Sequence, residues 1–184
     1  MAIEEPRFTL LREDGAIQIR EYAPVVVAET EVQGDFERVS NEGFRRLAGY
    51  IFGGNRSRSK IAMTAPVSQS QSQKIAMTAP VGQVPGPGGG WLIRFTMPAE
   101  HRLDSLPVPD DDRVHLRELP AQRVAALRFS GSWSRRRFEA QRARLEQWLA
   151  EAGLEPAGEP TFARYNPPWV PWFLRRNEVL LPLK

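Results

Sequence analysis

A proline-rich segment near the C-terminus, YNPPWVPWFLRR (165–176), combines large aromatic and basic side chains that could form a binding surface. Its large aromatic and basic residues are Trp169, Trp172, Phe173, Arg175 and Arg176. Proline cannot donate to a sheet ladder, so the segment is expected to form a loop, where exposed aromatic groups often mark a binding surface. Guanidinium groups bind carboxylates or phosphates in a bidentate manner. This segment is therefore the first candidate binding site.

Residues that could ligate a metal are few and scattered. The chain has no cysteine, which excludes thiolate ligands, thiol nucleophiles and disulfides. His101 lies in an acidic loop and His115 begins an expected strand, so neither falls on the aromatic segment. Met63 and Met77 have the soft sulfur that binds metals such as copper(I), but inward-facing methionines on adjacent strands are typical of a core. The sequence assigns no metal ligand.

Three glutamates on expected strands, Glu21, Glu118 and Glu178, are the candidates for catalysis, because a buried glutamate beside an arginine can act as a general base. Glu21 and Glu118 directly follow Arg20 and Arg117, which favours a structural ion pair in each half of the chain. No constellation of nucleophile and base is visible, and no catalytic residue is assigned.

Composition limits the class of protein. With 184 residues and 41% hydrophobic content, residues 1–184 are expected to form one domain. We find no signal peptide, no long uncharged apolar run, and no zinc-finger or RNA-binding motif. The expectation is a soluble, cytoplasmic protein that does not insert in membranes or bind nucleic acid.

The elements that would position the candidate residues follow from periodicity and turn signals. A hairpin of two strands is expected over 7–32, with its turn at Asp14-Gly15, and helical spacing predicts helices over 36–51 and 134–152. The octapeptide KIAMTAPV occurs at 60–67 and again at 74–81. Its alternation predicts two neighbouring strands joined by a Ser/Gln turn, followed by a third strand over 91–98. A last strand is expected over about 177–183.

A larger repeat indicates the architecture. Residues 17–36 align with 114–133 at a constant offset of 97, and a helix follows each copy. The chain is therefore expected to be an α+β protein with two β-β-α-β-β halves, about 7–98 and 113–183. Their pseudo-two-fold arrangement would form a curved antiparallel sheet or barrel flanked by two helices. A ligand is expected in a cleft between the halves.

Several motifs resemble those of the SOUL haem-binding protein family. They are the doubled KIAMTAPV, the REY strand opening, the YIFGGN end of the first helix and YNPPWVPWFLRRNEV. The resemblance extends from about residue 7 to 183 and implies the same duplicated fold. It also implies binding of haem or another tetrapyrrole in an apolar groove between the first helix and the proline-rich loop.

A macrocycle needs apolar side chains on both faces and cations at its carboxylate edge. On the first helix, Val39, Phe44, Leu47 and Ala48 are the candidates for one wall. Trp169, Trp172 and Phe173 are the candidates for the other, and Arg175 or Arg176 would bind a propionate. Apolar residues at helical spacing are also typical of a core, so that alternative stays open for the four helix positions. The cofactor expected from the resemblance is non-covalent haem. The alternative functions are a sensor-like domain for other amphipathic ligands and an enzyme acting on a small hydrophobic substrate.

Overall fold

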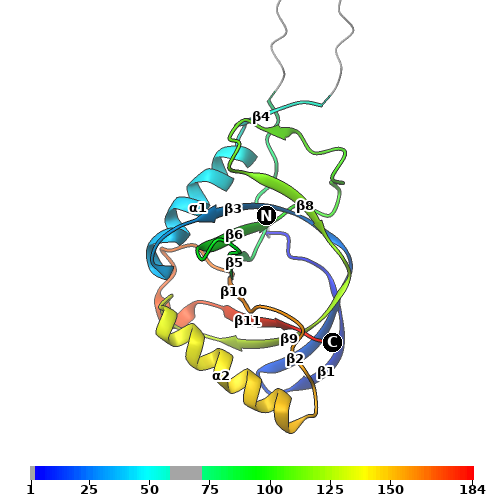
Figure 1. The fold of residues 1–184 in the computed structure, drawn as a ribbon, viewed down its shortest axis with the longest axis vertical. Coiled ribbons are helices and arrows are strands. Elements are labelled where there is room, and N and C mark those ends of the chain that lie inside the picture. The colour runs from blue at the N-terminus through cyan, green and yellow to red at the C-terminus, as the bar shows by residue number, and fades with distance from the viewer. Residues whose placement is uncertain (1–2, 59–71) are drawn as a thin grey trace, which may run out of the picture.

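The computed structural model describes residues 3–58 and 72–184, which form a strongly curved sheet with two helices on its outer side (Figure 1). The strands of the main sheet are β1 (Phe8–Asp14), β2 (Ile17–Tyr22), β3 (Val25–Val32), β5 (Val81–Pro85), β6 (Trp91–Thr96), β8 (His115–Leu119), β9 (Gln122–Phe129), β10 (Thr161–Arg164) and β11 (Asn177–Pro182). The helices are α1 (Phe36–Ile51), α2 (Arg135–Glu151) and the short 3-10 helix η1 (Trp172–Leu174), and β4 (Asn55–Arg56) pairs with β7 (Val108–Pro109).

The order of strands confirms the duplication. The 9-stranded sheet runs β1-β2-β9-β11-β10-β5-β6-β3-β8, and every pairing in it is antiparallel. Apart from β1, the order is symmetric about the β10–β5 pair. The pair β2–β9 corresponds to the pair β8–β3, and each joins a strand of one repeat to a strand of the other. The two edge strands, β1 and β8, are not hydrogen-bonded to each other in the described residues. The curved antiparallel sheet is therefore confirmed, without closure into a continuous ladder.

The segment 7–32 forms three strands rather than the two expected. The turn at Asp14-Gly15 is confirmed, and Gly15 has a φ of 57°, a left-handed conformation that glycine adopts without strain. Beyond it, the chain bends at Ala23-Pro24 and divides the second expected strand into β2 and β3. Because proline has no amide hydrogen, the ladder is interrupted at this bend.

Both long helices begin and end within one residue of the expected positions. Asp35 is the residue before α1, but its side chain makes no capping hydrogen bond; its carbonyl oxygen accepts from the amides of Arg38 and Val39, both at 3.0 Å. Before α2, Ser134 Oγ accepts from the Arg137 amide at 3.3 Å, as an N-cap does. Gly153 follows α2 with a φ of 68° and ends it.

The second KIAMTAPV copy does not form the strand that its alternation predicts. Residues 72–77 are irregular, Thr78 makes one isolated bridge to Glu4, and β5 begins only at Val81. Ile75 is nevertheless buried, and its amide donates to the Ile51 carbonyl at 2.8 Å at the end of α1. Pro80 cannot donate to a ladder, so the regular strand starts after it. The first copy, residues 60–67, lies outside the described residues, and so does the expected pairing of the two copies.

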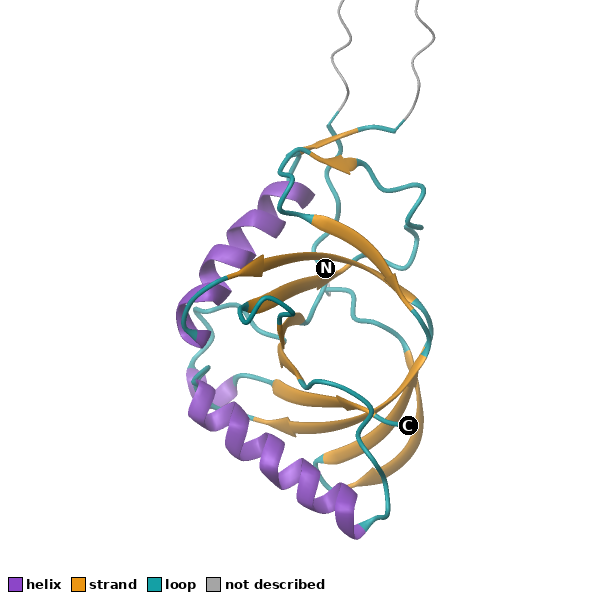
Figure 2. Ribbon diagram, in the orientation of Figure 1, coloured by secondary structure: helices purple, strands orange, loops and turns teal. Residues whose placement is uncertain are grey.

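The two faces of the sheet differ in chemistry. The outer face carries apolar residues such as Ile19, Ala28 and Leu127, which pack with the buried sides of α1 and α2. Figure 2 shows both helices outside the curve of the strands. Successive strand residues point to opposite faces, so Arg20 and Glu178, which alternate with core residues, lie on the inner face. The main apolar core is therefore between helices and sheet, not inside the curve.

Within residues 3–58 and 72–184, no helix is both long enough and apolar enough to cross a membrane.

Candidate functional site

The aromatic segment (residues 165–176) connects β10 to β11, and it exposes most of its large side chains. The exposed fractions are 82% for Trp169, 58% for Trp172, 58% for Phe173 and 64% for Leu174. Trp172 and Phe173 are in edge-to-face contact, with ring centroids 5.5 Å apart. Four large apolar side chains within the loop of residues 165–176 form an exposed patch of the kind that marks a binding surface.

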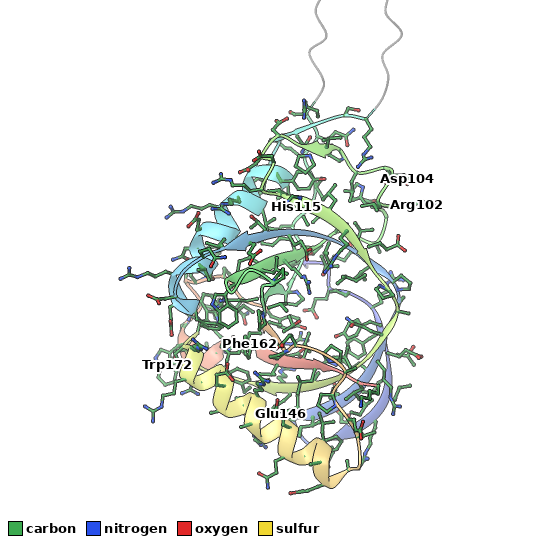
Figure 3. All side chains as sticks on the ribbon, viewed as in Figure 1. Arg102, Asp104, His115, Glu146, Phe162 and Trp172 are labelled. Carbon is green, nitrogen blue, oxygen red and sulfur yellow. The ribbon has the colours of Figure 1, made fainter. Side chains whose placement is uncertain are left out.

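Internal hydrogen bonds fix this segment in place. Arg175 Nε donates to the Val170 carbonyl at 2.8 Å, and its Nη2 donates to the Pro168 carbonyl at 2.7 Å. The Arg175 guanidinium also lies 4.2 Å from the centre of the Trp133 ring, just before α2. Figure 3 accordingly shows Trp172 at the outside of the molecule, near the first turns of α2. The aromatic groups are therefore displayed on a stiffened backbone.

Arg164, the last residue of β10, anchors the start of the segment to both helices. Its side chain is buried, its Nη1 donates to Ser40 Oγ of α1 at 2.8 Å, and its guanidinium lies 5.4–5.7 Å from the rings of Phe36, Trp133 and Phe138. Nε has no hydrogen-bond partner. Burial lowers the pKa of Arg164 to about 10, so the group stays charged at neutral pH. No sequence signal distinguishes this arginine from a solvated one at a strand end.

Three of the four predicted α1 residues lie in the core. Val39, Leu47 and Ala48 are buried on the side of α1 that packs against β3 and β6. Phe44 is 36% exposed, and its ring meets Phe95 at 5.4 Å between centroids. Only Phe44 of these four therefore offers a ligand substantial surface.

Arg176 points to a buried network on the inner face of the sheet. Its Nη1 binds the carboxylate of Glu5 at 3.0 Å, its Nη2 lies 3.1 Å from Glu178 Oε1, and its guanidinium stacks 3.8 Å from the centre of the Tyr165 ring. Both predicted cations of the segment thus have protein partners. A propionate would have to replace or share those partners.

Glu178 is the centre of this network and is fully buried. Arg20 holds both of its oxygens, at 2.7 and 2.9 Å, and the Tyr165 hydroxyl donates to Oε2 at 2.8 Å. Burial raises the pKa of Glu178, but the hydrogen bonds and charge of Arg20 outweigh it and leave that pKa lowered. A carboxylate whose oxygens are so occupied is a weak proton acceptor. Its contacts fit a structural role.

The expected ion pairs between adjacent residues are wrong. Arg20 pairs with Glu178 rather than Glu21, and Arg117 lies 3.4 Å from Glu29 rather than binding Glu118. Adjacent residues of a strand point to opposite faces, which separates them. The two pairs are not equivalent either, because Arg20 binds a glutamate of β11 and Arg117 a glutamate of its neighbour β3.

Two adjoining cavities include none of the nine predicted binding residues. The larger, about 750 Å3, lies beside the N-terminal segment and the loop that follows β6; His101 and Met97 contribute to it. The smaller, about 100 Å3, lies within the curve and is lined from both halves. His115 is exposed on β8, and Met77 packs partly buried against the core. The cleft between halves expected from the duplication corresponds to the smaller cavity.

Comparison with known proteins agrees with this architecture. The family model described as SOUL heme-binding protein matches residues 3–182. The chain is 30% identical to Heme-binding protein 2 of Homo sapiens over 170 residues, 91% of this chain and 78% of that protein. It is 28% identical to Heme-binding protein 1 of Xenopus laevis over 165 residues, 89% of this chain and 82% of that protein.

Among solved structures, the C-terminal domain of EcmrR has a similar fold. The TM-score is 0.65 at 11% identity, covering 91% of this chain and 96% of that one. At this identity the likeness concerns the fold alone. The match of the family model over nearly the whole chain shows that the protein belongs to the SOUL haem-binding protein family.

Proposed function

We propose that this chain binds haem or a related tetrapyrrole non-covalently, with one face of the macrocycle against the aromatic segment. The observation that carries the proposal is the exposure of Trp169, Trp172, Phe173 and Leu174 on a loop stiffened by three prolines. Membership of the family and the names of its relatives support haem as the ligand. Stacking on flat aromatic groups suits a ligand with two wide apolar faces.

In this proposal α1 forms the second wall of the groove. Phe44 presents its exposed edge to the ligand, while Val39, Leu47 and Ala48 hold α1 on the sheet from behind. Arg175 or Arg176 binds a propionate by exchanging one of its present acceptors for the ligand carboxylate. For Arg175 the exchange replaces carbonyl acceptors by an anion, which makes the stronger charge-assisted hydrogen bond.

The residues of the aromatic segment can contact the faces and carboxylates of the macrocycle, but they offer no ligand for its iron. Axial ligands in haem proteins are His, Cys, Met or Tyr, and residues 166–176 contain none of these. Tyr165, just before them, donates its hydroxyl proton to Glu178. The site would therefore select the porphyrin by its faces and carboxylates, and iron-free protoporphyrin IX should bind about as tightly as haemin.

Titration of the purified protein with haemin, followed by the Soret band, and with protoporphyrin IX, followed by fluorescence, tests this proposal. We expect saturable one-to-one binding of both, with affinities within a few-fold of each other. Trp172→Ala should weaken both by about fivefold or more, since about 1 kcal/mol of stacking is lost.

Phe52→Ala is the matched control, because Phe52 is 59% exposed and caps the other end of α1. Its replacement should leave binding unchanged. Equal losses in the two variants, or a linear response without saturation, would refute the proposed site.

A further inference from the structure

The two cavities adjoin, the smaller within the curve of the sheet and the larger beside the start of β3 and the end of β6. Pro6, Ala23, Val25 and Thr96 line both of them, so the inner chamber, about 100 Å3, and the outer chamber, about 750 Å3, share a wall. The combined volume is within the range of small-molecule sites. Arg102 and Asp104, at the edge of the outer chamber, lie away from both helices in Figure 3.

The charged lining of the inner chamber is positive. Arg94 is the one charged residue among the described residues that line it. Hydroxyl and amide groups that can donate hydrogen bonds come from Tyr22, Thr96, Thr161 and Gln122. Apolar walls come from both halves of the chain, among them Val27, Val124 and Leu180. This lining favours a small anionic group over a cation.

The carboxylates nearest the inner chamber are already neutralised. Glu29 is shared by two guanidinium groups, with Arg94 Nε at 2.6 Å and Arg117 Nε at 3.4 Å. The two guanidinium charges of Arg94 and Arg117 therefore exceed the single carboxylate charge of Glu29. Glu178, the other buried carboxylate, is held by Arg20 and Arg176, and Arg176 is itself paired with Glu5. The charge left over beside the chamber is positive.

The outer chamber is mainly apolar and its charges nearly cancel. Its apolar lining includes Pro24, Val26, Met97, Pro98 and Leu103. Its charged or titratable residues are Glu4, Glu5, Arg7, Arg58, His101, Arg102, Asp104 and Glu118.

Most of these acids have partners. Glu5 binds Arg176, Asp104 lies 3.4 Å from Arg102, and Glu4 Oε1 accepts from the Ala99 amide at 2.8 Å. Arg7 and Glu118 have no hydrogen-bond or ion-pair partner within residues 3–58 and 72–184. Such a chamber suits an apolar body rather than a charged head.

From these features we propose that the two chambers form a binding site for an amphipathic carboxylate. The carboxylate lies in the inner chamber against Arg94, and the apolar body fills the outer chamber. The inference is independent of the tetrapyrrole proposal, because the chambers and the aromatic segment use different residues, apart from Tyr165 at the junction.

Isothermal titration calorimetry with dodecanoate, below its micelle-forming concentration, tests the proposal on the full chain. Dodecyltrimethylammonium, with the same apolar chain and the opposite charge, is the comparison ligand. We expect saturable binding of dodecanoate and much weaker binding of the cation. Arg94→Gln should weaken dodecanoate binding about tenfold or more, because a charge-assisted hydrogen bond is lost.

Two further variants keep the test decisive if Arg94→Gln perturbs folding. Ala23 is exposed and lines both chambers, so Ala23→Trp should block binding sterically while leaving the core intact. Glu118→Gln removes an unpaired negative charge and should strengthen binding. Arg136→Gln, on the exposed side of α2, is the matched control and should have no effect.

Absence of saturable binding, equal binding of the cation, or an unaltered affinity in Ala23→Trp would overturn the inference. Trp172→Ala separates the two proposals, because it should weaken haemin binding and leave dodecanoate binding unchanged.

Discussion

The outer face of the sheet packs Ile19, Ala28 and Leu127 beneath the helices, whereas the inner face buries Arg20, Glu29 and Glu178 within its curve. Both faces come from the same strands, in which alternate residues point to opposite sides. The outer face gains stability by burying apolar area, which is not directional. The inner face relies on charged groups, each of which must find a specific partner.

This difference indicates where the molecule can accept change. When a side chain in an apolar core is shortened, the free energy of unfolding falls by an amount that depends on the apolar area removed and on the cavity left behind. A buried charge that loses its partner costs several kcal/mol, because desolvation is no longer compensated. The inner face should therefore be the more sensitive to single substitutions.

The largest expected effect is on the inner face, at Arg20. Arg20→Met removes the main partner of the fully buried Glu178 and should reduce the free energy of unfolding by about 3–5 kcal/mol. Arg117, the symmetry-related residue, is 51% exposed, and Arg117→Met should cost about 1 kcal/mol or less. Urea denaturation followed by circular dichroism measures both. Similar losses in the two variants would contradict the assigned difference in burial.

On the outer face, Leu47→Ala should reduce the free energy of unfolding by about 2–5 kcal/mol, because the side chain is fully buried between α1 and the sheet. Phe44→Ala, three residues earlier on α1, removes a larger but partly exposed ring and should cost only about 1–2 kcal/mol. The same denaturation measurement applies. A greater loss for Phe44 than for Leu47 would mean that α1 packs through its other side.

Much of this architecture could be predicted from the sequence. The helix bounds follow from apolar spacing and from Gly153, and the duplication follows from the repeat at an offset of 97 residues. These signals are local or repeated, so one sequence contains them. The exposure of the aromatic segment was likewise predictable, because its prolines exclude a regular ladder.

The partners on the inner face could not be predicted in the same way. Arg20 and Glu178 are separated by 158 positions, and only the strand order brings them together. Glu21 was the nearer choice in sequence, yet it lies on the opposite face of β2. The KIAMTAPV alternation was misleading for a related reason. Ile75 is buried by contact with the end of α1, without a strand around it.

The smallest expected effect is a dependence of stability on pH, which distinguishes the buried charges of the inner face from an exposed ion pair in a loop. The pKa of Glu178 is lowered in the folded protein, so the unfolded chain binds its proton at a higher pH. The stabilisation from Glu178 is therefore fully present above the ordinary glutamate pKa, about 4.5, and is lost as the pH falls through the folded-state value. Glu178→Gln should make the free energy of unfolding less steeply dependent on pH between about 5 and 3.

Asp111→Asn is the comparison, because the pKa of Asp111 is lowered to about 2 by Arg113 in an exposed pair, where solvent weakens the interaction. Urea denaturation at several pH values should show the greater flattening for Glu178→Gln, and a greater flattening for Asp111→Asn would place the acid-sensitive charge on the surface instead.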